Sequence, residues 1–210
     1  MTEQQLKRKA HFETQLKRFV PAGFEEMAAD LLIKYRVKFT ITNPRSTKLG
    51  DYRPPFGAET FHRITVNGNL NPYSFLITYL HEFAHLETYE KYKRSVKPHG
   101  EEWKAAFRML LWPAVQTGLL PKVIEDALMK SMSNTKASSC TDVQLSRVLK
   151  QFDANPSLKN LLEDLPESTI FTLQGKRFKK GQLRRSRFTC LELNSGKSFL
   201  VHRLAEVEIE

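Results

Sequence analysis

The first third of the chain changes from a helical to an alternating pattern of apolar residues. Apolar residues recur at helical spacing over residues 3–35, except where Pro-Ala-Gly at 21–23 interrupts them, so we predict two helices. Apolar and polar residues alternate over residues 37–42 and 61–68, which is typical of strands. The segment 45–55 between them is basic and rich in turn-forming residues. The pattern therefore predicts a small antiparallel sheet after the two helices.

Helical spacing returns in the middle of the chain. It predicts helices over residues 72–93, 100–111 and 121–131, and the first of them begins with Pro72, a residue suited to the first turn of a helix. The small polar residues of 131–139 then indicate a domain boundary.

The C-terminal part predicts mainly strands. A short helical stretch at roughly 142–163 precedes three strand patterns over residues 169–173, 187–193 and 198–201. Residues 194–197 (Asn-Ser-Gly-Lys) are suited to a hairpin turn between the last two.

These elements predict an α+β fold in three parts. Residues 1–132 would form a domain of helices packed on a small antiparallel sheet, residues 133–166 a linker with a short helical segment, and residues 167–210 a small, mainly β, basic module. A chain of 210 residues is long enough for one domain of about 130 residues and a smaller appendage.

Cysteine usage and apolar runs indicate the compartment. Cys140 and Cys190 are too few for a disulfide framework or a four-cysteine zinc site, and we expect them to be buried thiols in a reducing environment. The segment 1–5 lacks the apolar region of a signal peptide, and no run approaches the roughly 18 apolar residues of a membrane span. The sequence therefore predicts a cytoplasmic protein with no membrane partner.

The helix predicted at 72–93 carries a candidate metal site. His81 and His85 are four residues apart, so their side chains project from the same side of a helix, one turn apart, and can share one zinc ion. Glu82 lies beside them and can accept a proton from a water molecule without binding the metal itself. This is the H-E-x-x-H arrangement of zinc peptidases, in which the glutamate is the general base. The alternative is a helix whose two histidines face solvent or a packed neighbour.

A third ligand is needed to complete a catalytic zinc site. The metzincin pattern His-x-x-Gly-x-x-His is excluded, because Thr88 and Lys91 stand where glycine and histidine should follow His85. A gluzincin-like zinc would take a glutamate some 20 or more residues downstream, and Glu101 and Glu102 come slightly early for this role. His99, 14 residues after His85, is the best candidate, and three histidines leave the fourth position open, as in catalytic sites. The remaining histidines are predicted to bind no metal: His11, His62 and His202.

At these residues the sequence resembles the SprT-like metallopeptidases, the family that includes Spartan. The resemblance rests on residues 64–67 (Ile-Thr-Val-Asn), 80–86 (Leu-His-Glu-Phe-Ala-His-Leu), 98–104 (Pro-His-Gly-Glu-Glu-Trp-Lys) and 47–50 (Thr-Lys-Leu-Gly). It covers roughly residues 20–115, about half of the chain.

The resemblance implies one catalytic Zn²⁺ on His81, His85 and His99, with catalysis by Glu82. It also implies a minimal gluzincin-like architecture of helices packed on a small antiparallel sheet, with an open cleft. Spartan-type members cleave proteins bound or crosslinked to DNA, so protein substrates and single-stranded or damaged DNA are the implied partners, and DNA repair the implied process. Many members carry a zinc ribbon of paired cysteines; this chain has no C-x-x-C, so we expect no second zinc.

Basic residues favour a nucleic-acid partner. The chain has 33 basic and 23 acidic residues, a net charge of +10, which attracts polyanions. A basic run lies between residues 176 and 187, and it is accompanied by Phe178 and Phe188. On strands, the cations of this run could track a phosphate backbone while an aromatic ring stacks on a base. The alternative is a sheet edge protected by charge. A second candidate contact is Arg45, Lys48 and Arg53. The basic run, which contains no acid, is Lys176, Arg177, Lys179, Lys180, Arg184, Arg185 and Arg187.

The sequence thus predicts a zinc-dependent endopeptidase that cleaves DNA-associated or DNA-crosslinked proteins, with Glu82 as general base. One alternative is a nucleic-acid-binding protein with a structural or vestigial metal site, and another is a general cytosolic peptidase indifferent to DNA. Glu82 favours an enzyme, because a purely structural zinc has no use for a base.

Overall fold

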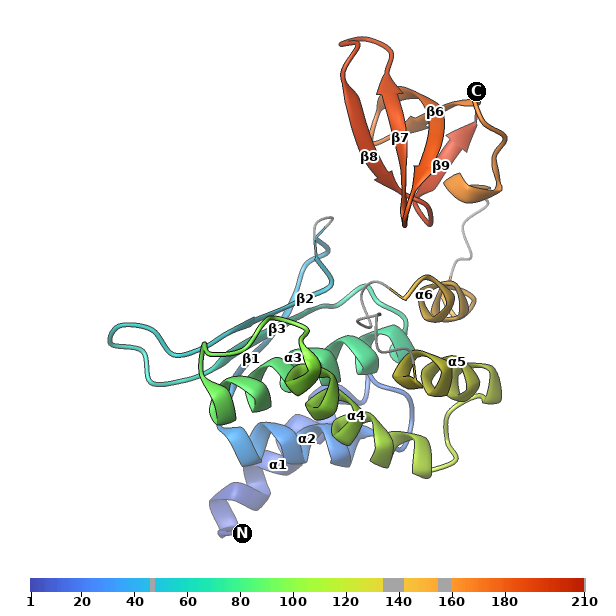
Figure 1. Ribbon diagram of the computed structural model, residues 1–210. Helices are drawn as coiled ribbons and strands as arrows, with labels where there is room; N and C mark the ends of the chain where they lie inside the picture. Colours follow the sequence, from blue (N-terminus) through green and yellow to red (C-terminus); the bar gives the residue numbers. More distant parts are fainter. Residues whose placement is uncertain (46–47, 134–141, 155–159, 210) are drawn as a thin grey trace. The chain divides into compact units, whose positions relative to one another are not determined.

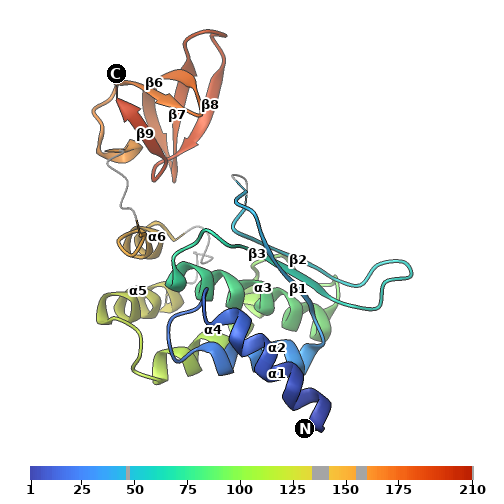
Figure 2. The ribbon, with the colours of Figure 1, turned by 180° about the vertical axis from the view of Figure 1, so that it is seen from behind.

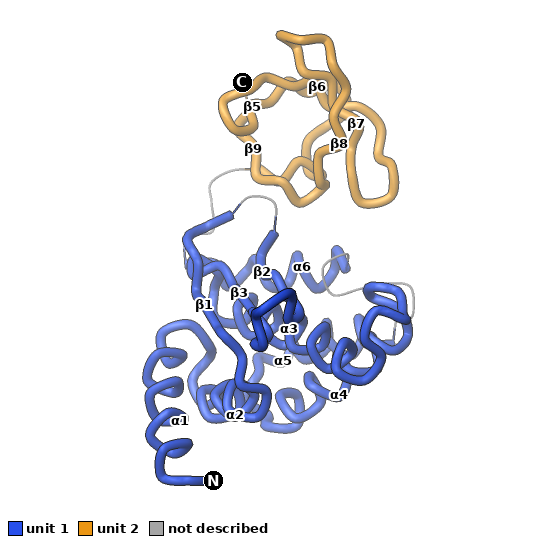
Figure 3. The backbone as a smooth tube through the Cα atoms, turned by 90° about the vertical axis from the view of Figure 1, so that its left-hand side faces the viewer, with its two compact units in different colours: residues 1–154 blue, residues 155–210 orange. Residues whose placement is uncertain are grey.

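Two compact units make up the chain, Met1–Ala154 and Asn155–Glu210, and Figure 3 colours them separately. Each has its own hydrophobic core. The predicted α+β composition is confirmed by the helices and strands that the chain contains. In the stretches described, no helix has both the length and the apolar character that crossing a bilayer requires. This computed structural model describes residues 1–45, 48–133, 142–154 and 160–209.

Unit 1 begins with the two helices that the apolar pattern predicts, α1 (Glu3–Leu16) and α2 (Glu25–Tyr35). Thr2 and Gln5 form a capping box, which satisfies backbone N–H groups at the start of α1. The chain turns between the helices at Gly23, whose φ of 90° is favourable only for glycine. The two helices pack against each other, so the interruption at residues 21–23 acts as the expected break.

A three-stranded sheet follows, with β1 (Lys38–Thr42), β2 (Gly50–Arg53) and β3 (Arg63–Asn67) in the order β1-β3-β2. The two stretches that were predicted to pair antiparallel, β1 and β3, run parallel instead. The physical reason is that the turn-rich segment between them contains a strand of its own, β2, so the chain reverses direction twice between β1 and β3. β2 pairs antiparallel with β3, and the sheet is therefore mixed.

Helix α3 (Pro72–Tyr92) runs through unit 1, and both ribbon views show the sheet along one side of it (Figures 1 and 2). The Tyr79 hydroxyl donates to the Ala28 carbonyl oxygen at 2.6 Å, which ties α3 to α2. The Tyr79 ring also meets the Phe39 ring of β1 edge-on, with 5.3 Å between centroids. Most residues of α3 are buried, so the polar side chains it carries lie within the core.

Three more helices complete unit 1: α4 (Glu101–Gln116), α5 (Lys122–Ser133) and α6 (Val143–Lys150). The first two match the predicted positions, but α4 continues past the predicted end and through Pro113. α6 is much shorter than the predicted helical stretch. It begins at Asp142, whose carboxylate accepts hydrogen bonds from backbone N–H groups of its first turn.

The boundary between the units lies later in the chain than the sequence indicated. The polar stretch at 131–139 falls mostly outside the described residues. α6 belongs to unit 1, because the Asn71 amide donates to the Leu149 carbonyl oxygen at 2.9 Å and to the Asp153 carboxylate at 2.6 Å. The segment 133–166, expected to be a linker, is instead divided between the two units.

Unit 2 is mainly β, as predicted. Its strands form one antiparallel arrangement, and a 3-10 turn, η1 (Leu162–Asp164), follows the first of them. The strands are β4 (Asn160–Leu161), β5 (Ile170–Leu173), β6 (Lys176–Arg184), β7 (Arg187–Glu192), β8 (Ser198–His202) and β9 (Glu206–Ile209). Their order is β4-β9-β5-β6-β7-β8.

Strands β5, β7 and β8 correspond to the predicted ones, whereas β4, β6 and β9 have no predicted counterpart, and β4 lies where the helical stretch was expected. In β6 the buried positions are Phe178 and Lys180, and the intervening Lys179 is exposed. A lysine at an inward position conceals the apolar alternation by which a strand is recognised. The core of unit 2 is formed by residues such as Phe171 and Cys190; the second cysteine, Cys140, lies outside the described residues.

Asn71→Ala is expected to lower the free energy of unfolding by about 2 kcal/mol, because it removes a helix cap, one buried hydrogen bond and one part-buried hydrogen bond. The Asn71 side chain also accepts from the Ser74 N–H at 2.9 Å at the start of α3. Urea unfolding followed by circular dichroism measures the loss. Asn69→Ala, at an exposed position in the preceding turn, is the control and should cost less than about 0.5 kcal/mol. Equal losses in the two variants would contradict the role of Asn71.

Candidate metal centre

Three histidines of unit 1 converge on one point. His81 and His85 lie one turn apart on α3, and His99 precedes α4. The Nε2 atoms of His85 and His99 each lie 3.1 Å from Nε2 of His81. One ligand atom from each histidine lies within 4.8 Å of the others, and the described residues contain no other group of three or more His, Cys, Asp or Glu with this property. The three predicted ligands are therefore brought together, and His11, His62 and His202 are not among them.

The backbone conformation at His99 directs its imidazole toward the other two histidines. Its φ is 58°, in the left-handed region that residues other than glycine seldom adopt. The following Gly100 is the N-cap of α4, and a Cβ there would lie 3.0 Å from the Lys97 carbonyl oxygen. Such local strain is often found at functional sites, where the surrounding structure maintains it. A sharp turn into α4 thus places the His99 imidazole against those of α3.

The geometry and charge of this cluster fit a metal ion such as zinc. Two nitrogens bound at about 2.0–2.1 Å to one tetrahedral zinc lie about 3.3 Å apart. The observed separations of 3.1 Å are close to this value. Burial lowers the pKa of His81 to about 2 and that of His85 to about 4, and it also lowers the pKa of His99. The imidazoles are therefore neutral at pH 7, the form that binds metals.

Trp103 forms a wall against the three imidazoles. Its ring centroid lies 4.6 Å from that of His81, 5.3 Å from that of His85 and 4.7 Å from that of His99. The indole also stacks on Phe107, one turn later in α4, at 5.0 Å. Trp103 is fully buried, so this wall excludes water from one side of the cluster and restricts how the imidazole rings can rotate.

Glu82 is buried next to the histidines and lies against strand β2. A Cβ on Gly50 would come within 2.4 Å of Glu82 Oε1 and 2.8 Å of Thr78 Cγ2, so only glycine permits this approach of strand and helix. The backbone of Tyr52, two residues farther along β2, also lies beside the Glu82 carboxylate and favours its charged form. The carboxylate is thus held between the helix that carries it and the edge of the sheet.

The surroundings of Glu82 make its carboxyl group unusually basic. Burial, together with the nearby Asp51 carboxylate, raises the pKa of Glu82 to about 8, and Arg45 and Lys48 oppose the shift. A carboxyl group whose pKa lies near neutral pH can both accept and return a proton, which is what a general base requires. The arrangement can therefore combine a metal ion with a base beside it.

The second candidate nucleic-acid contact is engaged within its own chain. The Arg45 Nε donates to Asn67 Oδ1 at 2.8 Å, while Lys48 and Arg53 pair with Asp51 at 2.7 and 2.9 Å. The Asn67 amide in turn donates to the carbonyl oxygens of Arg45 and Lys48. Arg45 and Lys48 thus lie near Glu82, whereas the Arg53 side chain is 61% exposed.

Most of the predicted nucleic-acid-binding residues of unit 2 are exposed, but one is not. Lys180 is 4% exposed, and its ammonium group donates to the carbonyl oxygens of Leu165 and Glu163 and lies 4.0 Å from the Phe188 ring centroid. Burial lowers the pKa of Lys180. A side chain used in this way is not available to a phosphate. The exposed residues are Lys176, Arg177, Lys179, Arg184, Arg185 and Arg187.

The aromatic residues of the basic run are also buried. Phe178 and Phe188 belong to the core of unit 2, so the expectation that one of them stacks on a base is wrong. The reason is the alternation of β6 and β7, which turns both rings inward. Phe199 of β8 is 41% exposed and lies 5.9 Å from the Lys176 ammonium group. Phe199 therefore provides a partly exposed aromatic ring next to the basic strand β6.

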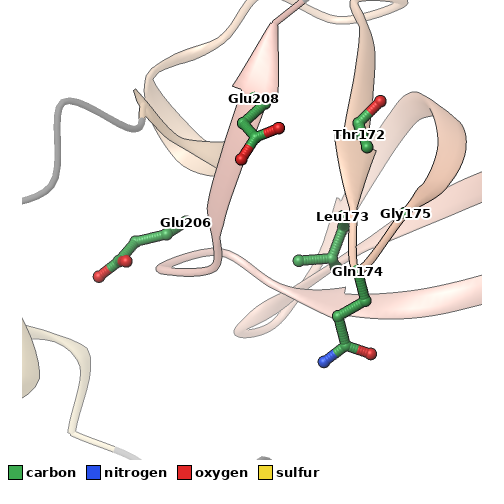
Figure 4. Close-up of a pocket in the computed structure, with 6 residues that line it drawn as sticks. All are labelled: Thr172, Leu173, Gln174, Gly175, Glu206 and Glu208. Carbon is green, nitrogen blue, oxygen red and sulfur yellow. The ribbon is translucent and has the colours of Figure 1, made fainter.

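Unit 2 also contains a pocket of about 340 Å³ that lies between β9 and the end of β5 (Figure 4). Glu206 and Glu208 contribute two carboxylates to it, which repel phosphate groups. The pocket is therefore unsuited to a nucleic acid and distinct in character from the exposed cations. Its lining is Thr172, Leu173, Gln174, Gly175, Glu206 and Glu208.

No family model, curated protein or solved structure with which the chain was compared matches it.

Spacing along the sequence identified the histidines and Glu82 but not the residues that support them. Gly50 and Tyr52 lie in the segment interpreted as turn-rich, and nothing local indicates that they meet Glu82. Trp103 had a usable signal, because it stands four residues after His99 and so lies one turn farther along the helix that follows. Thr47, part of the family resemblance, lies outside the described residues.

The purified protein is expected to hold about one zinc ion per chain, and His99→Ala should reduce this to well below one, because two imidazoles bind zinc much more weakly than three. Atomic emission after gel filtration measures the zinc content. His11→Ala changes an exposed histidine of α1 and should leave the content unaltered. Retention of full zinc by the His99 variant would exclude His99 as a ligand.

Proposed function

We propose that the chain is a zinc-dependent endopeptidase of the SprT-like type that cleaves DNA-associated or DNA-crosslinked proteins. The observation that carries the proposal is the convergence of three neutral imidazoles beside one buried, basic carboxylate. A structural zinc site normally has four protein ligands, whereas three leave a position open. The packing of helices on a small sheet, with β2 against Glu82, is compatible with a gluzincin-like architecture.

In this proposal Glu82 acts as the general base. A bound zinc ion would polarise the substrate carbonyl and make a water molecule more acidic. Glu82 would accept the proton of the attacking water and return it to the leaving amine. Strand β2, which approaches the carboxylate at Gly50, would hold it in place while the proton moves, and Trp103 keeps bulk water away from the histidines.

The DNA part of the proposal is supported by charge. The chain carries a net charge of +10, and six cations of the run between residues 176 and 187 are exposed on unit 2. Exposed arginines and lysines on neighbouring strands suit phosphate groups, and Phe199 offers a partly exposed ring near them. Unit 2 would then bind the DNA while unit 1 cleaves the protein attached to it.

Glu82→Gln should keep zinc but lose about 10²–10⁴-fold in the rate of proteolysis, because the amide cannot accept the proton. The assay is cleavage of a DNA-binding protein with and without single-stranded DNA, alongside a measurement of zinc content. Glu13→Gln, on α1, is the matched control and should behave as wild type.

Cleavage by the Glu82 variant at the wild-type rate would refute the enzyme proposal. DNA binding without proteolysis by the wild-type protein would favour the alternative of a nucleic-acid-binding protein with a structural metal. Equal proteolysis with and without DNA would favour a general peptidase.

Replacing Lys179, Arg184 and Arg187 together by alanine should weaken DNA binding and flatten its dependence on salt, since each lost phosphate contact lowers the slope of log K against log salt by about 0.9 for duplex DNA. Fluorescence anisotropy at several salt concentrations measures the slope. Lys7→Ala removes an exposed cation from α1 and serves as the control. A wild-type slope near zero would contradict phosphate contacts.

A further inference from the structure

We propose that Tyr52 is a positioning residue, which holds the base Glu82 and the metal ligand His85 in one fixed arrangement. This inference rests on the proposed function and extends it to a residue outside the H-E-x-x-H motif. Tyr52 lies on β2, opposite Ile64 of β3, and so belongs to the edge of the sheet. It contacts α3 at three separate points.

The first contact is made by the backbone. Strand β2 approaches α3 at Gly50, where the missing side chain leaves room for Glu82. Two residues later the backbone of Tyr52 lies beside the Glu82 carboxylate and favours its charged form. The room left for this carboxylate therefore depends on where the strand places residues 50–52. A shift of β2 along or away from α3 would move the base.

The second contact is made by the ring. The Tyr52 and His85 rings are nearly parallel, with 8° between their planes and 6.3 Å between their centroids. The Tyr89 ring, one turn after His85, lies 6.3 Å from the same tyrosine. Trp103 contacts His85 from helix α4, so the imidazole is held by rings from two different elements. The rotation of His85 is thus restricted by Tyr52 as well as by Trp103.

The third contact anchors the hydroxyl group. The Tyr52 hydroxyl lies 2.9 Å from His62 Nδ1, and His62 Nε2 lies 3.2 Å from Glu90 Oε1. These distances fit a chain of two hydrogen bonds in which the tyrosine donates to Nδ1 and the histidine donates from Nε2 to the carboxylate. Glu90 is on α3, so the chain returns to the helix that carries Glu82 and His85.

Together these contacts form a closed path between β2 and α3. The helix provides Glu82, His85 and Glu90, and Tyr52 meets the first through its backbone and the second through its ring; it reaches the third through His62. Catalytic groups must be held to within a fraction of an ångström, because a misplacement of about 1 Å can cost about 10²-fold in rate. A residue whose backbone, ring and hydroxyl group are each tied to one helix meets this requirement.

Three variants separate the contacts. Tyr52→Leu removes the ring and the hydroxyl, Tyr52→Phe removes the hydroxyl alone, and His62→Leu removes the anchor while leaving Tyr52 intact. Tyr73→Leu is the matched control, because it also removes a half-buried tyrosine ring, one that lies on α3 and packs on Phe152 with 4.8 Å between centroids. Each protein is examined with zinc for proteolysis and with cobalt for its visible absorption spectrum, which reports ligand geometry.

Tyr52→Leu should lower kcat by about 10–100-fold with little change in KM and should alter the cobalt spectrum. Tyr52→Phe and His62→Leu should fall between this variant and wild type, and Tyr73→Leu should retain the wild-type kcat and spectrum. A Tyr52→Leu protein with the wild-type kcat and cobalt spectrum would overturn the proposal, as would a Tyr73→Leu protein with the same defects.

Failure of the proposed function would be seen differently. If the wild-type protein binds cobalt but cleaves no protein, the endopeptidase proposal fails, while the spectra of the Tyr52 variants still test whether this residue positions His85. If the wild-type protein binds no metal, both proposals fail.

Discussion

Burial of α3 is the constraint on which the rest of unit 1 depends. A helix that is apolar on nearly every side must be covered all round, yet this one carries two imidazoles and a carboxyl group into the core. Burial opposes charge on each of them, so the histidines stay neutral and Glu82 becomes more basic. The neighbouring elements supply what the burial requires: the Trp103 ring, the missing side chain of Gly50 and the backbone of Tyr52. The same desolvation that costs stability leaves the imidazoles in the neutral form that could bind a metal ion.

Helices were predictable to the extent that their apolar residues are periodic. Residues 72–93 illustrate this, because a long stretch of apolar residues at helical spacing, with proline in its first turn, is typical of a helix. Strand direction was not, since alternation shows that a strand has two faces but not which neighbour it pairs with or in which sense. β2 has the sequence Gly-Asp-Tyr-Arg, which indicates a turn, and only its pairing with β3 makes it a strand.

In the candidate site, too, some residues could be predicted from the sequence and others could not. Its ligands could be predicted because two of them are fixed by the geometry of one helix, and His99 was the best remaining candidate near it. Gly50, Tyr52 and Asn67 could not, because they act through contacts between elements that are distant in sequence. Counting cations was also insufficient in unit 2, where the alternation of β6 sends Lys180 into the core and leaves Lys179 at the surface.

The difference in burial between Lys179 and Lys180 has a chemical consequence. The amine of Lys180 is enclosed by backbone carbonyl oxygens and an aromatic ring, whereas the amine of Lys179, one residue earlier, is open to solvent. Reagents that acylate lysines therefore encounter two adjacent amines of very different reactivity. Modification at residue 179 leaves the strand intact, but acylation at residue 180 requires unit 2 to open first. The ratio of acylation at Lys180 to acylation at Lys179, measured by mass spectrometry, therefore reports whether unit 2 is folded.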